Sequence, residues 1–160
     1  IVGDGPYRGE LENVAKQMDV WERLIFTGMV APRQIPDYYA AGDIFVSASN
    51  SETQGLTYIE AMASGLPLLC RADACLDGVI SDGVNGLLYH TEKDFLQHLY
   101  TLKNDFTFRN QIGIMARQSV QKRYSVQAFA SSCVNVYENL IQSFQQHYVS
   151  PHIDSLHYLY

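Results

Sequence analysis

Asp43-Ile-Phe-Val-Ser47, the polar stretch from Ser49 to Gln54 and the stretch from Leu56 to Ser64 together decide the fold of this chain. The first is short, apolar and rich in strand-forming residues, and the third has a helical pattern that ends at Gly65-Leu-Pro67. They predict a strand, a loop and a helix that begins at Gly55. The start of such a helix carries unpaired N–H groups and a positive dipole end, so we expect an anion beside Gly55.

Two glutamates flank this predicted anion site. Side chains on a helix lean toward its N-terminus, so Glu60 points back to the opening turn, whereas Glu52 lies in the preceding loop. Carboxylates suit hydroxyl groups rather than phosphate. The pair therefore fits a ligand with hydroxyl groups on both sides of its phosphates, as in a nucleotide sugar. Taken without the surrounding sequence, the two acids are better explained by a favourable dipole position for Glu52 and a solvated Glu60.

Four further short apolar runs are expected to form strands, and they are Ile1-Val2, Arg23–Thr27, Leu66–Cys70 and Gly86–Tyr89. Helices are expected between them over 6–18, 33–41 and 56–64, with a short turn at 79–82. Strands that alternate with helices predict one parallel sheet covered by helices. Ligands bind beyond the carboxyl ends of such strands, so Gly28, Met29 and Val30 are candidates to flank a base, with a plain connector as the alternative.

The glycines near the start of the chain do not form a dinucleotide fingerprint. Gly3-x-Gly5-x-x-x-Gly9 misses the required spacing by one residue, and a structural turn is the better interpretation. Toward the other end, helices are expected over 93–103, 107–122 and 125–147, with Thr91 as a cap. We expect their apolar stripes to be core seams. The stripes are Phe95, Leu99 and Leu102; Phe108, Ile112 and Met115; and Phe129, Val136, Tyr137, Leu140 and Phe144.

Composition narrows the function classes. The chain is 47% hydrophobic and 18% charged, which is ordinary for a globular domain, and it has no apolar run long enough to span a membrane. A net charge of −6 argues against nucleic acid as a partner. Cys70, Cys75 and Cys133 have no metal-ligand spacing, which favours reduced thiols in the cytosol, with Cys70 in the core. The spacing of His147, His152 and His157 is also unlike that of metal ligands.

The central stretch resembles a known family. Asp43-Ile-Phe-Val-Ser-Ala-Ser, followed by Glu52-x7-Glu60-Ala-Met-Ala-Ser-Gly-Leu-Pro67, is similar to the donor-site motif of the retaining nucleotide-sugar glycosyltransferases of family 4. Four further segments resemble landmarks of the family and occur in the family's order: Ile1–Pro6, Phe26–Gly28, Ala40–Asp43 and Asp82–Leu88. The resemblance as a whole extends over about residues 1–125. The resemblance implies the C-terminal half of a GT-B glycosyltransferase. That half is an α/β domain with a Rossmann-like parallel sheet and helices on both faces.

The resemblance also implies roles for individual residues. Glu60 binds the nucleotide ribose, Glu52 is the catalytic contact to the donor sugar, and the turn that meets the phosphates and sugar comprises Gln54, Gly55, Leu56 and Thr57. No metal and no cofactor besides the nucleotide-sugar donor is implied. The version Thr53-Gln-Gly-Leu-Thr57 is most similar to bacterial diacylglycerol glucosyltransferases. UDP-glucose and a lipid acceptor are therefore the implied substrates.

The same resemblance implies how the whole protein is organised. Residues 1–147 are expected to form the nucleotide-sugar-binding domain, with a tail over 148–160. The last helix and the tail would cross to an N-terminal acceptor-binding domain, and that domain would also supply cations for the phosphates. The implied location is cytoplasmic, with peripheral attachment at the inner membrane face. The alternatives are a GT-B-like sugar-nucleotide epimerase or phosphorylase, and a non-catalytic nucleotide-sugar-binding module.

Overall fold

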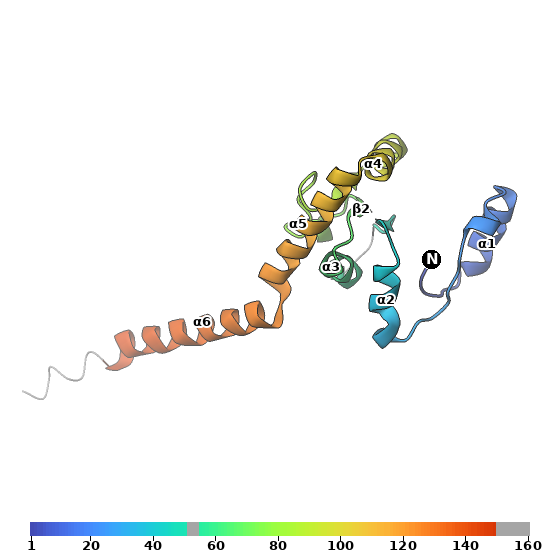
Figure 1. The fold of residues 1–160 in the computed structure, drawn as a ribbon. Helices are drawn as coiled ribbons and strands as arrows, with labels where there is room; N and C mark the ends of the chain where they lie inside the picture. Colours follow the sequence, from blue (N-terminus) through green and yellow to red (C-terminus); the bar gives the residue numbers. More distant parts are fainter. Residues whose placement is uncertain (51–54, 150–160) are drawn as a thin grey trace, which may run out of the picture.

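The chain folds around a small parallel sheet, as a computed structural model that describes residues 1–50 and 55–149 shows (Figure 1). The strands are β1 (Phe45–Ser47), β2 (Leu68–Arg71) and β3 (Leu87–Tyr89), in the order β1-β2-β3. In the register of the sheet, Leu69 pairs with Val46 on one side and with Leu87 on the other. The predicted parallel α/β sheet is confirmed for these three strands.

Helices cover both faces of β2. Its alternating side chains divide the core in two, because successive residues of a strand point to opposite faces. Leu68 and Cys70 pack with residues of α3 (Leu56–Ala63) and α5 (Phe106–Tyr124), whereas Leu69 packs with Leu102 of α4 (Glu92–Asn104). Cys70 is a core residue, as predicted. Its burial raises the pKa of its thiol to about 12.

The other helices lie close to the expected ranges. They are α1 (Arg8–Gln17), α2 (Ile35–Ala40) and α6 (Val126–Phe144), with short turns η1 (Trp21–Arg23), η2 (Pro32–Gln34), η3 (Ala74–Leu76) and the π-helical η4 (Gln145–Val149). The cap at Thr91 is confirmed, since its hydroxyl accepts from the Asp94 amide at 3.2 Å and Asp94 accepts from the Thr91 amide at 3.0 Å. The turn expected at 79–82 forms earlier, at η3, because Asp73 caps it through the Cys75 amide.

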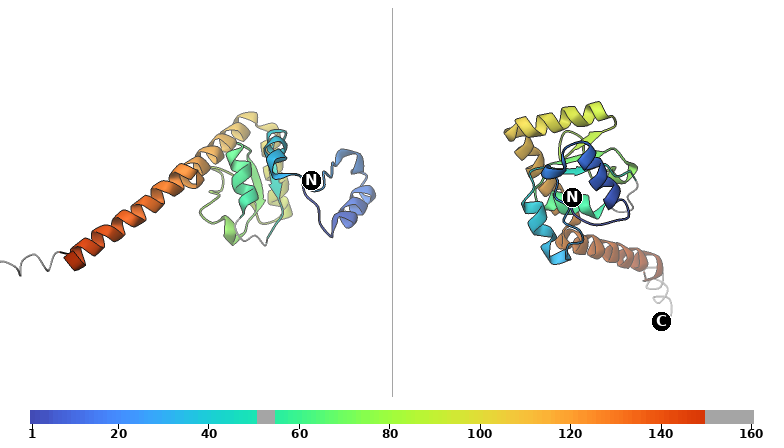
Figure 2. Two further views of the ribbon diagram at one scale, coloured as in Figure 1. Left: turned by 90° about the horizontal axis from the view of Figure 1, so that it is seen from below. Right: turned by 90° about the vertical axis from the view of Figure 1, so that its right-hand side faces the viewer.

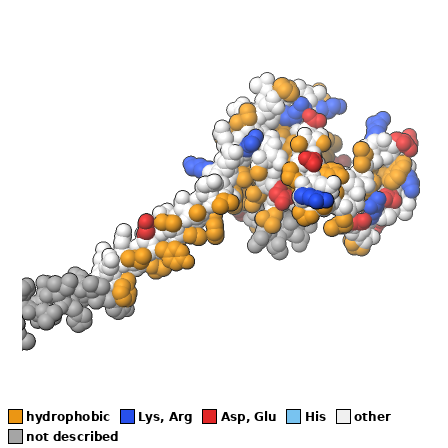
Figure 3. All heavy atoms as spheres, turned by 60° about the horizontal axis from the view of Figure 1, so that its bottom comes forward, with side chains coloured by type: hydrophobic (Ala, Val, Ile, Leu, Met, Phe, Trp, Pro, Cys, Tyr) orange, Lys and Arg blue, Asp and Glu red, His pale blue; other side chains and the backbone are white. Residues whose placement is uncertain are grey.

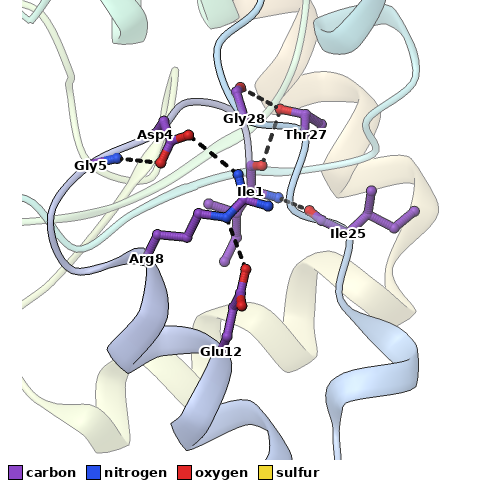
Figure 4. A network of polar contacts seen from close by, with 8 residues as sticks. All are labelled: Ile1, Asp4, Gly5, Arg8, Glu12, Ile25, Thr27 and Gly28. Carbon is purple, nitrogen blue, oxygen red and sulfur yellow. Dashed lines mark hydrogen bonds and ion pairs between the residues drawn. The ribbon is translucent and has the colours of Figure 1, made fainter.

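Two of the five expected strands are not formed as strands. The segments near Ile1 and Arg23–Thr27 lie side by side (Figure 4) and exchange backbone hydrogen bonds. Between these two segments a single bridge forms, from Gly3 to Gly28. The Ile1 amino group donates to Ile25 O at 2.7 Å, and the Thr27 amide donates to Ile1 O at 3.1 Å. A single isolated bridge with its flanking hydrogen bonds does not make a ladder, so neither segment is a strand.

The turn after this first segment is held by its own side chains (Figure 4). The Asp4 carboxylate accepts from the Gly5 amide at 2.8 Å and from Arg8 at 3.4 Å. Arg8 also donates to Glu12 at 2.9 Å. The polar groups of the turn are therefore engaged within the protein, which agrees with the interpretation of Gly3–Pro6 as a structural turn.

The apolar stripe of α6 is not a core seam, and that prediction was wrong. Its five residues, Phe129, Val136, Tyr137, Leu140 and Phe144, are 57–70% exposed. The helix projects away from the sheet (Figure 2), and apolar side chains gather along one side of it (Figure 3). Periodicity correctly predicts the helix and its apolar face, but it does not specify what packs against that face.

The turn that follows α3 is packed tightly against α5. A methyl group added at Gly113 would overlap the carbonyl oxygen of Gly65, and it would lie 3.6 Å from Pro67 Cδ. Gly65 itself has a φ of +81°, so this turn has little freedom to move away. The contact sets the distance between α5 and the turn that connects α3 to β2.

Replacement of Gly113 by alanine is expected to lower the free energy of unfolding by about 1–3 kcal/mol, because overpacking against backbone cannot be relieved by side-chain rotation. Urea unfolding followed by circular dichroism measures the change. Gly9→Ala is the matched control, since Gly9 also lies in a helix and an added methyl would meet no atom within 4 Å. Equal stability of the two variants would contradict the tight contact.

Candidate functional site

The start of α3 is a helix N-terminus without a side-chain cap among the described residues. Gly55 occupies the N-cap position with a φ of +58°, and its carbonyl accepts the first helical bond, from the Tyr58 amide at 3.0 Å. The amides of Leu56 and Thr57 precede that bond and have no acceptor within the helix. A side chain at position 55 would also place its Cβ 2.8 Å from Tyr58 Cδ2. Glycine at position 55 therefore supplies no capping side chain to this end of the helix.

A cavity of about 620 Å³ is lined by residues of this helix and of β1, which is an edge strand of the described sheet. Its lining includes an apolar part, made by Ile1, Val2, Ile35, Ile44 and Val46. It also includes a polar part, made by Thr57, Glu60 and the hydroxyl-bearing Tyr39 and Ser47.

Glu60 is held at the polar part by a tyrosine. Tyr39 of α2 donates its hydroxyl proton toward Glu60 Oε2 at 3.0 Å, and the Thr57 carbonyl oxygen lies 3.2 Å from the same hydroxyl. Burial raises the pKa of Tyr39, and the hydrogen bond to the Glu60 carboxylate and its negative charge raise it further. Tyr39 is therefore a donor and never an anion under physiological conditions.

Two other tyrosines hold the carboxyl end of β1. The Ser47 hydroxyl lies 2.9 Å from the Tyr58 hydroxyl of α3, and Tyr89 at the end of β3 donates to the Ser47 carbonyl oxygen at 3.3 Å. These bonds join the ends of β1 and β3 to the first turn of α3. The carboxyl end of β1 is thus fixed by side chains that come from three elements.

The structure brings together some of the predicted site residues. Met29, Val30, Thr57 and Glu60 line the cavity, and Gly55 and Leu56 form the helix start beside it. Gly28 is not among the described lining residues, and its backbone pairs with Gly3. Glu52 and Gln54 lie outside the described residues. Their predicted roles stay predictions.

Tyr39 was not singled out from the sequence. It belongs to a stretch that was predicted only as a short helix, and its contact with Glu60 spans 21 residues. No local motif identifies such a pair. The nearest signal is the position of Tyr39 on the element that precedes β1, at the edge where the parallel strands end.

The cavity supplies dipoles and hydrogen-bonding groups rather than charge compensation. Among its described lining residues there is no lysine or arginine. The residues described also contain no cluster of three or more His, Cys, Asp or Glu side chains that could hold a metal ion. What this site offers an anion is the open amides of α3, and what it offers a hydroxyl group is the carboxylate of Glu60.

Comparison with known proteins gives a consistent result. The profile of the family described as "Glycosyl transferases group 1" matches residues 1–119. Alpha-monoglucosyldiacylglycerol synthase of Streptococcus pneumoniae is 47% identical over 94 residues, which are 59% of this chain and 21% of that protein. The synthase of the same name from Acholeplasma laidlawii is 32% identical over 141 residues, or 88% of this chain and 35% of that protein.

Solved structures show the same fold. The structure of Anabaena HepE in complex with UDP superposes with a TM-score of 0.78 at 23% identity, and covers 86% of this chain and 40% of HepE. The C-terminal domain of the group 1 glycosyl transferase LpcC from Francisella tularensis is 31% identical and superposes with a TM-score of 0.67. The match covers 75% of this chain and 63% of the LpcC domain. The chain thus spans between about a fifth and a third of the synthases that it matches.

Proposed function

The chain belongs to the group 1 glycosyl transferases, and from that premise we propose that it is the donor-binding part of a retaining, metal-independent enzyme that transfers glucose from UDP-glucose. The observation that carries the proposal is the placement of Glu60 one turn into α3, beside the amides of Leu56 and Thr57, for which the described residues provide no side-chain cap. A carboxylate and an anion-binding helix start at that spacing suit the ribose and the diphosphate of one nucleotide.

In the transfer reaction, α3 would stabilise the leaving group. The bond from the anomeric carbon of glucose to the diphosphate oxygen breaks, and the acceptor hydroxyl oxygen bonds to the same carbon as its proton passes to an oxygen of the departing diphosphate. Negative charge grows on the departing diphosphate. The helix dipole and the amides of Leu56 and Thr57 stabilise that charge where it develops, which lowers the barrier more than it strengthens ground-state binding.

Glu52 is proposed to act on the sugar rather than on the nucleotide. This assignment rests on its place in the sequence, before the helix and away from Glu60, and on the family resemblance. Its carboxylate would accept hydrogen bonds from sugar hydroxyls that strengthen as the sugar gains positive charge. Gln54 would lie in the same turn, and Met29 and Val30 would flank the base.

The proposed donor takes support from the names of similar proteins. Two of them are alpha-monoglucosyldiacylglycerol synthases, and Anabaena HepE has been crystallised with UDP and with UDP-glucose. The synthase names indicate glucose as the transferred sugar, and the HepE complexes indicate UDP-glucose as a donor that this fold can bind. The polar lining residues of the cavity would contact the donor. The apolar lining residues favour further polypeptide, because they include β1, whose second edge pairs with no strand in the described part of the chain and needs pairing or cover.

The rest of the protein would supply the partner for α6. An N-terminal acceptor-binding domain is proposed to pack on the apolar side of α6 and to bring the cations that the diphosphate needs. Two features support this: the 57–70% exposure of the stripe from Phe129 to Phe144, and the absence of lysine and arginine among the described residues that line the cavity.

The acceptor is proposed to be diacylglycerol, met at the cytoplasmic face of a membrane. The names of the two similar synthases support it. The basic helix α5 offers less support than its sequence suggests, because Arg109 donates to carbonyls of α4 and Arg123 donates to the Gly78 carbonyl. Peripheral attachment would therefore depend chiefly on the rest of the protein. None of the helices in the described part of the chain is long and apolar enough to cross a membrane.

The two glutamates are expected to separate nucleotide binding from catalysis in the full-length protein. Glu60→Gln should weaken UDP binding by about 1.5–3 kcal/mol, since it removes a charged acceptor of ribose hydroxyl bonds. Glu52→Gln should leave UDP affinity unchanged and lower turnover with UDP-glucose. Titration calorimetry and steady-state kinetics measure both effects. The reverse pattern would exchange the two roles, and an unaltered Glu60→Gln affinity would remove the ribose assignment.

The apolar side of α6 is expected to matter only in the full-length protein. Leu140→Glu should destabilise that protein by about 1.5–3 kcal/mol, the burial energy of a leucine side chain, and should have little effect on the isolated chain, where Leu140 is exposed. Thermal unfolding of both forms tests this. Gln142→Glu adds the same charge at another exposed position of α6 and serves as the control. A loss of stability equal in both forms would contradict the docking of α6.

The full-length enzyme is expected to transfer glucose to diacylglycerol in anionic vesicles and to leave soluble sugars and polyols unmodified. Each lysine or arginine near an anionic surface contributes about 1 kcal/mol of attraction, so neutral vesicles with the same diacylglycerol content should support less transfer. Radiolabelled UDP-glucose and lipid extraction give the readout. Glucose found only on a soluble acceptor would exclude the lipid acceptor and leave the donor site unaffected.

A further inference from the structure

Tyr39 joins two elements that border the cavity. It comes from α2, close to the apolar part, and its hydroxyl reaches α3 at Glu60 Oε2 and at the Thr57 carbonyl oxygen. Within the described residues, Glu60 Oε1 makes no hydrogen bond or ion pair, so only one of its two carboxylate oxygens is engaged. The other is left to face a ligand.

The ring of Tyr39 is held from behind. It packs against the core around β1, with its centroid 6.2 Å from that of Phe45 at an interplanar angle of 48°. Phe45 in turn meets Tyr58 of α3 edge to face at 5.8 Å. The position of the Tyr39 hydroxyl is therefore set by the same packing that sets the end of β1 and the first turn of α3. A side chain fixed in this way can impose its geometry on a partner.

Glu60 needs such a partner. It is an exposed residue on a helix, and a glutamate side chain in that setting populates several rotamers, which must be lost when it grips a ligand. The hydrogen bond from Tyr39 selects one arrangement before the ligand arrives. Burial and the negative charge of Glu60 raise the pKa of Tyr39, so the hydroxyl keeps the proton that this bond requires.

We propose that Tyr39 is a positioning residue for the donor nucleotide: it occupies Oε2 of Glu60 and presents Oε1 to a ribose hydroxyl. This inference rests on the proposed function of Glu60. It also gives α2 a part in donor binding that does not require α2 to touch the ribose. A purely structural role would be different, because Tyr39 would then tie α2 to α3 and its loss would affect stability without regard to Glu60.

A double-mutant cycle on UDP affinity in the full-length protein separates these roles. Tyr39→Phe should weaken UDP binding by about threefold to tenfold, the effect of one hydrogen bond of ordinary strength. In a Glu60→Ala background the same substitution should have no effect, because no carboxylate remains to be positioned. Tyr100→Phe is the control for loss of a phenol hydroxyl, since Tyr100 lies exposed on α4 and is remote from the cavity.

A modified ligand gives a second readout that stability cannot imitate. 2′,3′-Dideoxy-UDP lacks the ribose hydroxyls, so its affinity should be the same for the wild-type protein and for Tyr39→Phe. Equal weakening by Tyr39→Phe in the wild-type and Glu60→Ala backgrounds, or equal weakening for UDP and the dideoxy ligand, would overturn the inference. So would a Tyr39→Phe protein of wild-type affinity.

The cycle also distinguishes failure of this inference from failure of the function on which it rests. If Glu60→Ala weakens UDP binding and Tyr39→Phe does not, the donor site stands and the positioning role of Tyr39 is overturned. If Glu60→Ala binds UDP as tightly as the wild type does, the ribose assignment of Glu60 is overturned, and the inference is overturned with it.

Discussion

Leu68, Leu69 and Cys70 have no exposed surface, so β2 must be covered by helices on both of its sides. Each fully buried leucine contributes about 1.5–3 kcal/mol, which is a large share of the net stability of a small domain. The cover on one side is α3 with α5, and their spacing is set where Gly113 meets the turn at Gly65. That contact also fixes the line of α3, and hence where its open N-terminus lies relative to the end of β1.

The sequence predicts best those parts of the fold that depend on local signals. The strand that ends at Ser47, the helix that follows Gly55, the cap at Thr91 and the seam of Phe95, Leu99 and Leu102 all form as expected. The segments at Ile1-Val2 and Arg23–Thr27 have strand-like composition but do not become strands. A parallel ladder needs a partner that is distant in the sequence, and composition cannot supply one. The wrong prediction for the apolar stripe of α6 has the same cause. The periodicity of the stripe is a local property of the sequence, whereas the surface that would pack against it is not encoded locally.

In the candidate site, too, residues with local signals could be predicted, whereas contacts between distant segments could not. Glu60 could be placed from helix geometry, Thr57 from the family resemblance, and Met29 and Val30 from the rule that ligands bind beyond strand ends. All four line one cavity. Gly28 was placed by the same rule, yet it is used for backbone pairing. Tyr39 could not be found, because its contact with Glu60 depends on how α2 packs against β1. The chemical groups of the site can thus be predicted from one stretch of sequence, whereas the position of Glu60 relative to Tyr39 depends on tertiary packing.

The start of α3 shows why stability and binding conflict at this point. A serine or aspartate at an N-cap stabilises a helix by about 0.5–2 kcal/mol, and it does so by accepting from the amides that would otherwise bind an anion. Gly55 forgoes that gain. Its φ of +58° and the 2.8 Å approach that a Cβ would make to Tyr58 both exclude a capping side chain. The helix is held instead by burial of Tyr58, Ala61 and Met62. Its amides can therefore remain open to a ligand without loss of the helix, which is the arrangement that a site for a departing diphosphate needs.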